Sequence, residues 1–481
     1  GPNRAPKFMM PNNLHFLMRE AYQNNDNDLQ NYVNLTLTKI AFGGVFDHVG
    51  GGFSRYSVDD KWHVPHFEKM LYDNAQLVSL YSDAYLITKN PLYKEVVFET
   101  LDFVKREMTN GNGTFYSSLD ADSTTKTGEL IEGAVYVWQV EELKTLLGSD
   151  YELFAAYYNV NDYGFWEHDN DVLIRSESDT VFSKKHNSSV EDITNKKTSW
   201  KQLLLKERAK RSRPRLDDKI LTSWNALMIK GYVDAYRVFG NDEFLDAAIR
   251  NAEFILNTQL KDDGGLYHNF KDGKSTINGY LEDYSTVVEA YLSLYENTLD
   301  EKWLNAARNL TNYAFDHFFN DQTKMFYFTS DDDTKLVSRS TEYRDNVIAS
   351  SNSIMAKNLL KLSHYFDNEA YSETAKIMLH NVMPEMSEYP STFSNWFDLM
   401  LNYTNNYYEV AIVGSEVHDK IKELNTFYLP NKLIIGSTED NDLPLLKNRF
   451  IDGKTLIYVC VNKACKLPVA EVEKAVTFIK E

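Results

Sequence analysis

The chain has 481 residues, 43 % of them hydrophobic and 14 % aromatic, and a formal net charge of −19. An acidic surface repels phosphate backbones and anionic lipid, so this charge argues against nucleic-acid and membrane partners. No apolar run approaches the ~20 residues that span a bilayer. The two cysteines are too few for a disulfide framework, which favours a reducing, cytoplasmic environment.

Apolar residues at helical spacing predict paired helices along most of the chain. The predicted pairs are 13–24 with 28–41, 66–88 with 92–108, 139–147 with 150–158, 217–239 with 242–260, 280–298 with 301–319, and 349–366 with 369–382. Six pairs suit an (α/α)6 toroid, a barrel of six helical hairpins, over residues 1–402. Within an insertion around 160–212, the polar run KKHNSSVEDITNKK is typical of a surface excursion or a lid.

The pattern changes after residue 402. The runs YYEVAIVG and KTLIYVCV predict strands, and residues 416–427 and 469–480 predict helices, so 403–481 is expected to be a small α/β segment. Within it, Cys460 and Cys465 are spaced as C-x4-C, which matches neither a thioredoxin C-x-x-C nor a zinc ribbon. We expect one buried and one exposed thiol, with a redox pair as the alternative.

One spacing between two aromatic residues recurs in the chain, in the pairs Tyr93 and Tyr116, Phe244 and Tyr267, and Trp303 and Phe326, with a weaker copy starting at Tyr371. A repeated helical unit predicts that equivalent positions face one centre. Counting back to the preceding inner helix, the register predicts four inward-facing side chains at one height: Asp73, Trp224, Asp283 and Ser351. The alternative is that they only cap their helices, because Asp and Ser accept hydrogen bonds from free N–H groups.

The loop DHVGGGFSRYSVDDKWHVPHFEKMLYDNAQL holds the densest set of polar candidates. The glycines at 50–52 would let a ligand approach the backbone closely. Pro65 predicts the first turn of a helix, which places His66 at the positive end of the helix dipole as a neutral imidazole able to accept a proton. Asp73 follows on the same helix face. Other candidate binding residues in this loop are Arg55, Tyr56, Trp62 and His63.

Further polar clusters precede or begin later inner helices. The candidate binding residues in them are Asp120, Asp122, Arg215, Asp218, Trp224, Asn225, Ser351 and Asn352. Asp and Ser in loops are also common turn formers, which is the alternative interpretation.

Three histidines of the first loop, His48, His63 and His66, lie near Asp47 and Glu68 in sequence. Their spacing matches no compact metal signature such as HExxH, so we expect no metal. A metal site and a purely structural role for the histidines are the alternatives.

Several motifs resemble a known family: GGVFDHVGGGFSRYSVDDKWHVPHFEKMLYDNAQL, SLDADS, EGAVYVW, RPRLDDKILTSWNALMIKGY, GYLEDY and ASSNS. In order and over nearly the whole chain, they look like the helical-barrel part of the YyaL-type thioredoxin-domain-containing proteins, which include spermatogenesis-associated protein 20. The resemblance implies a toroid similar in fold to N-acylglucosamine 2-epimerases and six-hairpin glycosidases. It also implies a thioredoxin-like domain, absent from these residues, as a partner.

Together these features predict a carbohydrate-active enzyme of the sugar epimerase or isomerase type, which transfers protons in a deep acidic and aromatic pocket. His66 is the expected base, with Asp73 or Asp283 as the partner acid. In this interpretation Arg55 and Arg215 polarise a carbonyl, while Trp224 and Trp62 stack on the sugar ring. No cofactor is expected.

Two alternatives stay open. Glycoside hydrolysis needs two carboxylates that flank the scissile bond, for which Asp73 with Asp283, or Asp120 with Asp122, are the candidate pairs. A non-catalytic module that docks a thioredoxin-like domain would instead present a broad exposed apolar patch.

Overall fold

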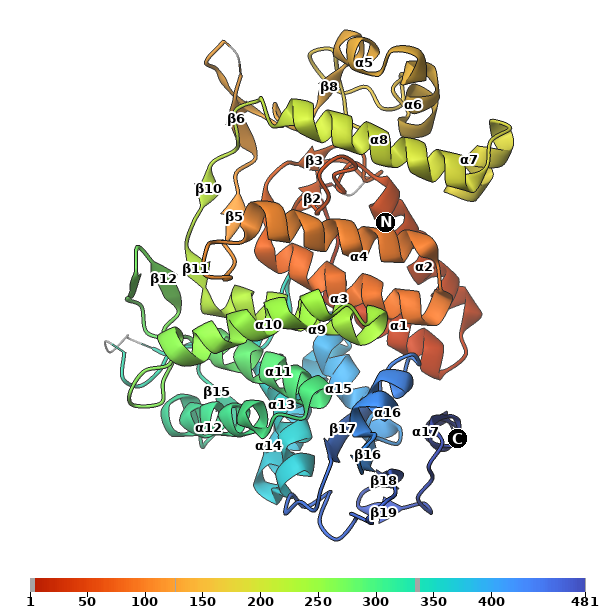
Figure 1. Cartoon of the computed structure of the whole chain (residues 1–481). Coiled ribbons are helices and arrows are strands. Elements are labelled where there is room, and N and C mark those ends of the chain that lie inside the picture. Colours follow the sequence, from red (N-terminus) through yellow and green to blue (C-terminus); the bar gives the residue numbers. More distant parts are fainter. Residues whose placement is uncertain (1–4, 126, 334–337, 481) are drawn as a thin grey trace.

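The computed structural model describes residues 5–125, 127–333 and 338–480. Within them, six helices form a closed inner ring in which each helix packs against the next (Figure 1). In ring order these are α1 (Pro11–Gln23), α3 (Leu71–Thr88), α9 (Thr222–Phe239), α11 (Leu281–Thr298), α13 (Ser351–Phe366) and α15 (Ser394–Thr404), and α15 packs against α1. This ring confirms the predicted toroid.

An outer layer of helices covers this ring, and each outer helix follows and packs against its inner partner. The outer helices are α2 (Asn27–Phe42), α4 (Pro91–Phe103), α10 (Asp242–Phe254), α12 (Glu301–Phe318) and α14 (Glu369–Met386). Each begins after an Asn or Asp whose side chain accepts a hydrogen bond from the first turn: Asp26, Asn90, Asn241, Asp300 and Asn368. Helices α4 and α10 continue as the π-helical turns η1 (Val104–Met108) and η3 (Ile255–Gln259). The main apolar core fills the space between the two layers.

Short antiparallel strands lie between consecutive helices. They are β1 (Lys7–Phe8), β2 (Tyr56–Ser57) and β3 (Pro65–His66) in one sheet; β4 (Lys69–Met70), β5 (Ser118–Leu119) and β10 (Leu216–Asp217) in a second; β11 (Ile220–Leu221), β12 (Asn269–Lys271) and β13 (Lys274–Ser275) in a third; and the pairs β6 (Asp122–Thr124) with β7 (Leu130–Glu132), β8 (Trp138–Gln139) with β9 (Asn170–Asp171), and β14 (Phe319–Asn320) with β15 (Met325–Phe326). Because β3 pairs with β2 and β4 pairs with β5, the helix predicted to begin at residue 66 begins only at Leu71.

A separate helical layer follows β8 and packs around its own core, which includes Trp138, Phe154 and Trp200. It consists of α5 (Val140–Leu147), η2 (Gly148–Asp150), α6 (Tyr151–Tyr158), α7 (Asp179–Lys185) and α8 (Val190–Arg208). The predicted pair 139–147 and 150–158 is therefore helical but does not belong to the ring. In the ring α3 packs directly against α9, and the sixth inner helix is instead α15, which follows the short η4 (Pro390–Thr392) and which the repeat did not predict as a helix. The predicted polar excursion is the end of α7 and the start of α8.

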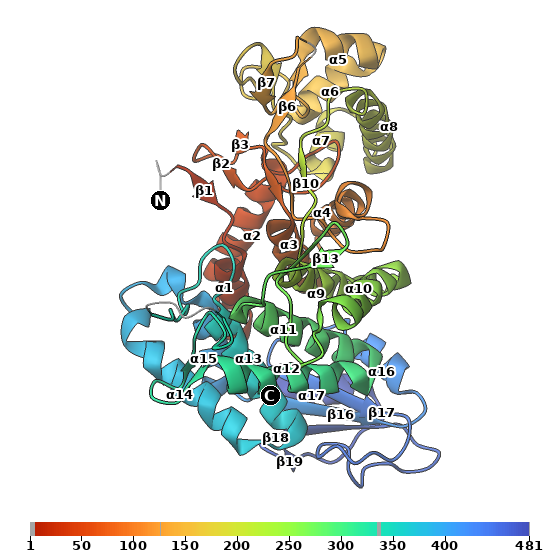
Figure 2. The same cartoon turned by 90° about the vertical axis from the view of Figure 1, so that its left-hand side faces the viewer.

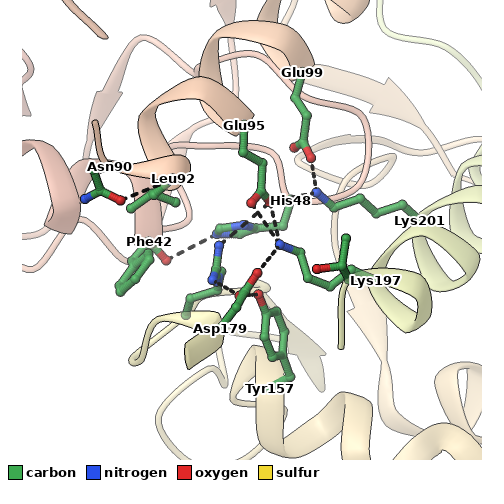
Figure 3. A network of polar contacts seen from close by, with 12 residues as sticks. Phe42, His48, Asn90, Leu92, Glu95, Glu99, Tyr157, Asp179, Lys197 and Lys201 are labelled. Atoms are coloured by element: carbon green, nitrogen blue, oxygen red, sulfur yellow. Dashed lines mark hydrogen bonds and ion pairs between the residues drawn. The ribbon is translucent and has the colours of Figure 1, made fainter. Parts of the chain in front are cut away.

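A charged clamp joins this layer to α4 (Figure 3). We use that name for Glu95 and Glu99 of α4, Asp179 of α7, and Lys197 and Lys201 of α8. The Lys197 ammonium lies 2.8 Å from carboxylate oxygens of both Glu95 and Asp179, and Lys201 pairs with Glu99. Two lysines one turn apart on α8 are thus paired with carboxylates of α4, and one of them also with α7.

The C-terminal segment forms a four-stranded sheet of order β17-β16-β18-β19, at the opposite end of the molecule from the helical layer (Figures 1 and 2). Its elements are β16 (Tyr408–Val413), α16 (Val417–Leu424), β17 (Lys432–Ser437), β18 (Leu456–Val461), β19 (Ala464–Cys465) and α17 (Val472–Lys480). Cys460 and Cys465 are register partners in the β18–β19 hairpin and form a disulfide, so the prediction of two free thiols is wrong. Across the described residues, no helix combines the length and apolar character that a membrane crossing needs.

Candidate active site

The ring encloses a cavity of about 270 Å³, to which all six inner helices contribute side chains. The cavity floor is the segment that leads into β17, which brings Tyr428, Leu429, Pro430 and Lys432 under the ring. Arg237 and Glu296 line the same end, near the last turns of α9 and α11. The C-terminal segment therefore closes the barrel where the inner helices end, and the ligand entrance is expected at the opposite end, where they begin.

Charges of both signs line the cavity. Six Lys and Arg side chains face five Asp and Glu side chains, with few aromatic residues among them. Most of these charges pair: Arg19 and Lys357 with Asp398, Arg237 with Asp83, Lys230 with Asp234, and Lys361 with Glu296. This lining differs from the acidic, aromatic pocket that the composition suggested, because the excess carboxylates of the chain lie elsewhere.

Two charged side chains of the cavity are not paired. Within the described part of the chain, neither Lys432 Nζ nor the Glu289 carboxylate makes a hydrogen bond or ion pair. Burial lowers the pKa of Lys432 to about 8. The charge of Glu296 opposes this shift, and the charges of Arg237 and Lys361 reinforce it. Both groups are free to bind a ligand.

An acid–imidazole cluster lies at the first turn of α11. The buried Asp283 carboxylate accepts hydrogen bonds from the N–H groups of Ser223 and Tyr280, each at 2.9 Å, and its Oδ2 lies 2.9 Å from Nδ1 of His268. Glu282 Oε1 is 3.9 Å from the same nitrogen. Because Glu282 precedes the cavity residue Glu289 by seven positions, it lies on the same face of α11, about two turns nearer the entrance.

The environment of this cluster shifts the pKa of both neighbours of Asp283. Burial, together with the charge of Asp283, raises the pKa of Glu282 to about 8, although His268 acts in the other direction. Burial alone would lower the pKa of His268, but its hydrogen bond to Asp283 and the charge of Asp283 raise it above the ordinary value. Since Asp283 holds Nδ1, the nitrogen left for proton exchange is Nε2. At neutral pH the cluster can present a neutral carboxylic acid at Glu282 beside the ring of His268.

A second carboxyl group lies at the start of α3. Asp73 is 3 % exposed, and its Oδ2 has no hydrogen-bond partner among the described residues. Burial raises the pKa of Asp73 well above its usual range, opposed by Arg55 and reinforced by Glu68. The ring of Tyr72 meets that of Trp224 edge-on at 4.8 Å. Trp224, on the intervening helix α9, therefore stands between the two clusters.

Of the four residues that the repeat placed at one height, Asp73, Trp224 and Asp283 are the third residues of their helices and Ser351 is the first of α13. Their side chains do not all point into the cavity. Asp283 caps its own helix, and the N–H and hydroxyl of Ser351 both bind the Glu342 carboxylate. For Asp283, the capping alternative describes its contacts best.

His66 is not in the first turn of a helix. It lies in β3, stacks on Tyr56 at 4.9 Å between ring centres, and places Nδ1 2.7 Å from Glu132 Oε1. The sequence prediction failed because Pro65 pairs with Ser57 in a sheet instead of starting α3. The helix-dipole argument for a neutral His66 therefore does not hold.

Other residues of the same loop serve the fold. Trp62 is 4 % exposed, and His63 Nε2 lies 3.1 Å from the carbonyl oxygen of Gly164. A Cβ on Gly51, where φ is +74°, would lie 2.1 Å from the Glu99 carbonyl oxygen. The absence of side chains in the glycine run thus allows α4 to pack close to the backbone there, at the place where a ligand was expected.

The candidates between the second and third barrel hairpins lie apart from the cavity. Arg215 is 87 % exposed and pairs with Asp120 at 3.0 Å, while Asp218 pairs with Lys271 at 2.7 Å. Asp122 lies in the β6–β7 hairpin. These contacts are those of surface turns.

Asn225 and Asn352 bind backbone. Asn225 accepts a hydrogen bond from the Phe115 N–H and donates one to its carbonyl, and Asn352 does the same with Phe326. Asn74 makes the same two hydrogen bonds with the backbone of Phe53. Each asparagine thus ties an aromatic segment to the start of an inner helix, which is a structural role that the repeat shares between its units.

Sequence reasoning missed His268, Glu282, Glu289 and Lys432 as candidate site residues. Helical periodicity could have found two of them, because Glu282, Glu289 and Glu296 recur every seven residues on α11. No local pattern marks His268 or Lys432, whose neighbours in the site come from distant segments.

Comparison with known proteins gives matches of two kinds. Residues 194–383, which include Trp224, His268 and Glu282, match the family model of the beta-L-arabinofuranosidase GH127 catalytic domain. Human spermatogenesis-associated protein 20 is 30 % identical over 97 % of this chain, and the chain spans 65 % of that relative.

Two solved structures are also similar. Cellobiose 2-epimerase from Bacillus thermoamylovorans has a TM-score of 0.45 at 14 % identity, covering 70 % of this chain and 66 % of the other. A GH76 alpha-mannanase from Bacteroides thetaiotaomicron has a TM-score of 0.46 at 13 % identity, covering 79 % and 76 %.

Proposed function

We propose that this chain, a homologue of spermatogenesis-associated protein 20 along nearly its whole length, is a carbohydrate-active enzyme that works by acid/base proton transfer at the barrel entrance. The observation that carries the proposal is the Glu282–His268–Asp283 cluster, with the pKa of Glu282 raised to about 8. The match of residues 194–383 to a glycosidase catalytic domain supports a sugar as the substrate.

In the proposed reaction, Glu282 is the acid and His268 is the base. Asp283 accepts a hydrogen bond from the N–H at Nδ1 of His268 and so leaves Nε2 to remove a proton from the carbon beside a sugar carbonyl. The protonated Glu282 donates its proton to the carbonyl oxygen, which gives an enediol. His268 then returns its proton to a carbon of the enediol while an enediol hydroxyl gives its proton back to Glu282, which completes an isomerisation or epimerisation. Trp224 provides an apolar face for the sugar ring, and the buried Asp73 is a second candidate acid.

Glycoside hydrolysis is the second candidate, and the GH127 match favours it specifically. Glu282 would then protonate the departing glycosidic oxygen, since a carboxylic acid with a raised pKa suits that role. The two reactions leave different products, so one screen separates them.

The test is a panel of free aldoses in D₂O, followed by NMR, together with nitrophenyl glycosides. Isomerase activity incorporates deuterium at the carbon beside the carbonyl, whereas hydrolase activity releases nitrophenol. We expect Glu282→Gln and His268→Gln to lose at least about a hundredfold in kcat/KM. Glu141→Gln, at a glutamate 84 % exposed on α5, is the matched control and should keep full activity. Wild-type turnover that survives in both site variants would remove the assignment.

The pH profile provides a further test. Turnover that needs protonated Glu282 should fall as the pH rises through about 8. Turnover that needs neutral His268 should fall on the acid side, above the ordinary histidine range. Asp283→Asn keeps an acceptor for the helix cap but removes the charge, so it should lower the pKa of His268 and move the acid limb to lower pH. An unmoved acid limb in this variant would contradict the role of His268.

A further inference from the structure

The floor of the barrel holds a cation without a partner. Lys432 opens β17 and lines the cavity, and its Nζ makes no hydrogen bond or ion pair within the described residues. Glu296, Arg237, Lys361 and Asp83 are the charged groups that act on it. Lys432 is half-buried and faces the cavity, and an ammonium held there without a counter-ion is costly, so a protein rarely keeps one without a use.

The carboxylates near Lys432 are already engaged. Glu296 pairs with Lys361 at 3.2 Å and accepts a hydrogen bond from the Tyr365 hydroxyl at 2.9 Å. Asp83 pairs with Arg237. The floor therefore carries three cationic and two anionic groups, and its field favours an added anion although the whole chain has a charge of −19.

This floor is far from the proposed reaction centre. Glu282 and Glu296 lie on one helix, fourteen residues apart, which is about 21 Å at 1.5 Å per residue. One monosaccharide at the entrance does not reach the floor. Any ligand of Lys432 therefore occupies a subsite of its own or is the charged end of a longer chain.

We propose that the cavity floor is an anion-binding subsite, in which Lys432 directly binds a carboxylate or phosphate group of a small molecule. Arg237 and Lys361 add long-range attraction, while their own partners keep them in place. The subsite does not depend on proton transfer at Glu282, so its failure and the failure of the proposed function are distinguishable.

The test is isothermal titration calorimetry at pH 8 with inorganic phosphate, glucuronate and neutral glucose, in buffers of different ionisation enthalpy. Phosphate or glucuronate should bind and glucose should not. Because Lys432 is about half-protonated near its pKa of 8, anion binding should take up about half a proton. Binding of phosphate alone identifies a phosphate group as the ligand, and binding of glucuronate alone identifies a sugar carboxylate. Binding of neither overturns the proposal.

Two substitutions at the same position separate direct contact from general attraction. Lys432→Met should weaken anion binding by about tenfold or more. Lys432→Arg keeps a charge that does not titrate, so it should bind within about threefold of wild type but take up no proton. Lys474→Met, at a lysine 64 % exposed on α17, is the control and should change neither quantity. Equal affinity and equal proton uptake in wild type and Lys432→Met would refute the subsite.

Discussion

The charged clamp between α4 and α8 and the cavity of the barrel both hold buried charge, but they differ in how fully that charge is paired. In the clamp, Lys197 lies between Glu95 and Asp179, and Lys201 meets Glu99 (Figure 3). In the cavity, Lys432 has no partner within the described residues. Paired charges hold surfaces together, whereas an unpaired charge that faces a cavity is a candidate for binding a ligand.

The largest expected effect comes from breaking the clamp. Lys197→Met removes one of the two cations that Glu95 and Asp179 share and leaves Arg175 beside them, so the free energy of unfolding should fall by about 2 kcal/mol. Urea denaturation measures this loss.

Lys144→Met is the matched control for the clamp. Its ammonium pairs with Glu141 at 2.7 Å on the exposed surface, and its loss should cost less than about 0.5 kcal/mol. Equal losses in the two variants would show that the clamp is no more than a surface ion pair.

An effect of opposite sign is expected at Lys432. At pH 7, Lys432→Met should raise the free energy of unfolding by about 1 kcal/mol, because it removes a desolvated ammonium without a counter-ion. The folded pKa of about 8 lies below the ordinary value of 10.5, so the folded state loses its proton first as the pH rises. Between pH 8 and 10.5 the unfolded state binds more protons than the folded state, so the free energy of unfolding of wild type should rise with pH and approach that of Lys432→Met. Urea denaturation at pH 7 and 10 checks this, and a destabilised variant at pH 7 would mean that Lys432 is structurally paired.

The smallest effect concerns the other unpaired charge. Glu289 lies about 10 Å from Glu296 along α11, and its negative charge opposes an anion at the floor. With a dielectric constant between those of water and a protein surface, removing it is worth about 0.8 kcal/mol. Glu289→Gln should therefore strengthen phosphate binding about fourfold by calorimetry. An unchanged phosphate affinity in Glu289→Gln would mean that the anion binds away from the cavity floor. Glu141→Gln is again the control.

Local signals predicted most barrel helices well. The helix expected at 280–298 is α11 (Leu281–Thr298), and the Asn or Asp that opens each outer helix accepts a capping hydrogen bond. Periodicity and caps depend on residues a few positions apart, which a sequence displays directly. Pairing between strands is not displayed even over short separations, which is why β3 displaced the predicted helix start at His66 and why the β18–β19 hairpin that joins Cys460 to Cys465 was not predicted.

The sequence by itself determined the helical hairpins, their caps and the repeat that orders them. Only the tertiary structure decided which polar side chains are consumed by pairing and which stay free. Asp283, predicted to face the centre, binds backbone and His268, whereas Lys432, in a strand far along the chain, ends beside Arg237 and Glu296. The physical reason is that the energy of a buried charge depends on its neighbours in space, and the closed ring sets those neighbours.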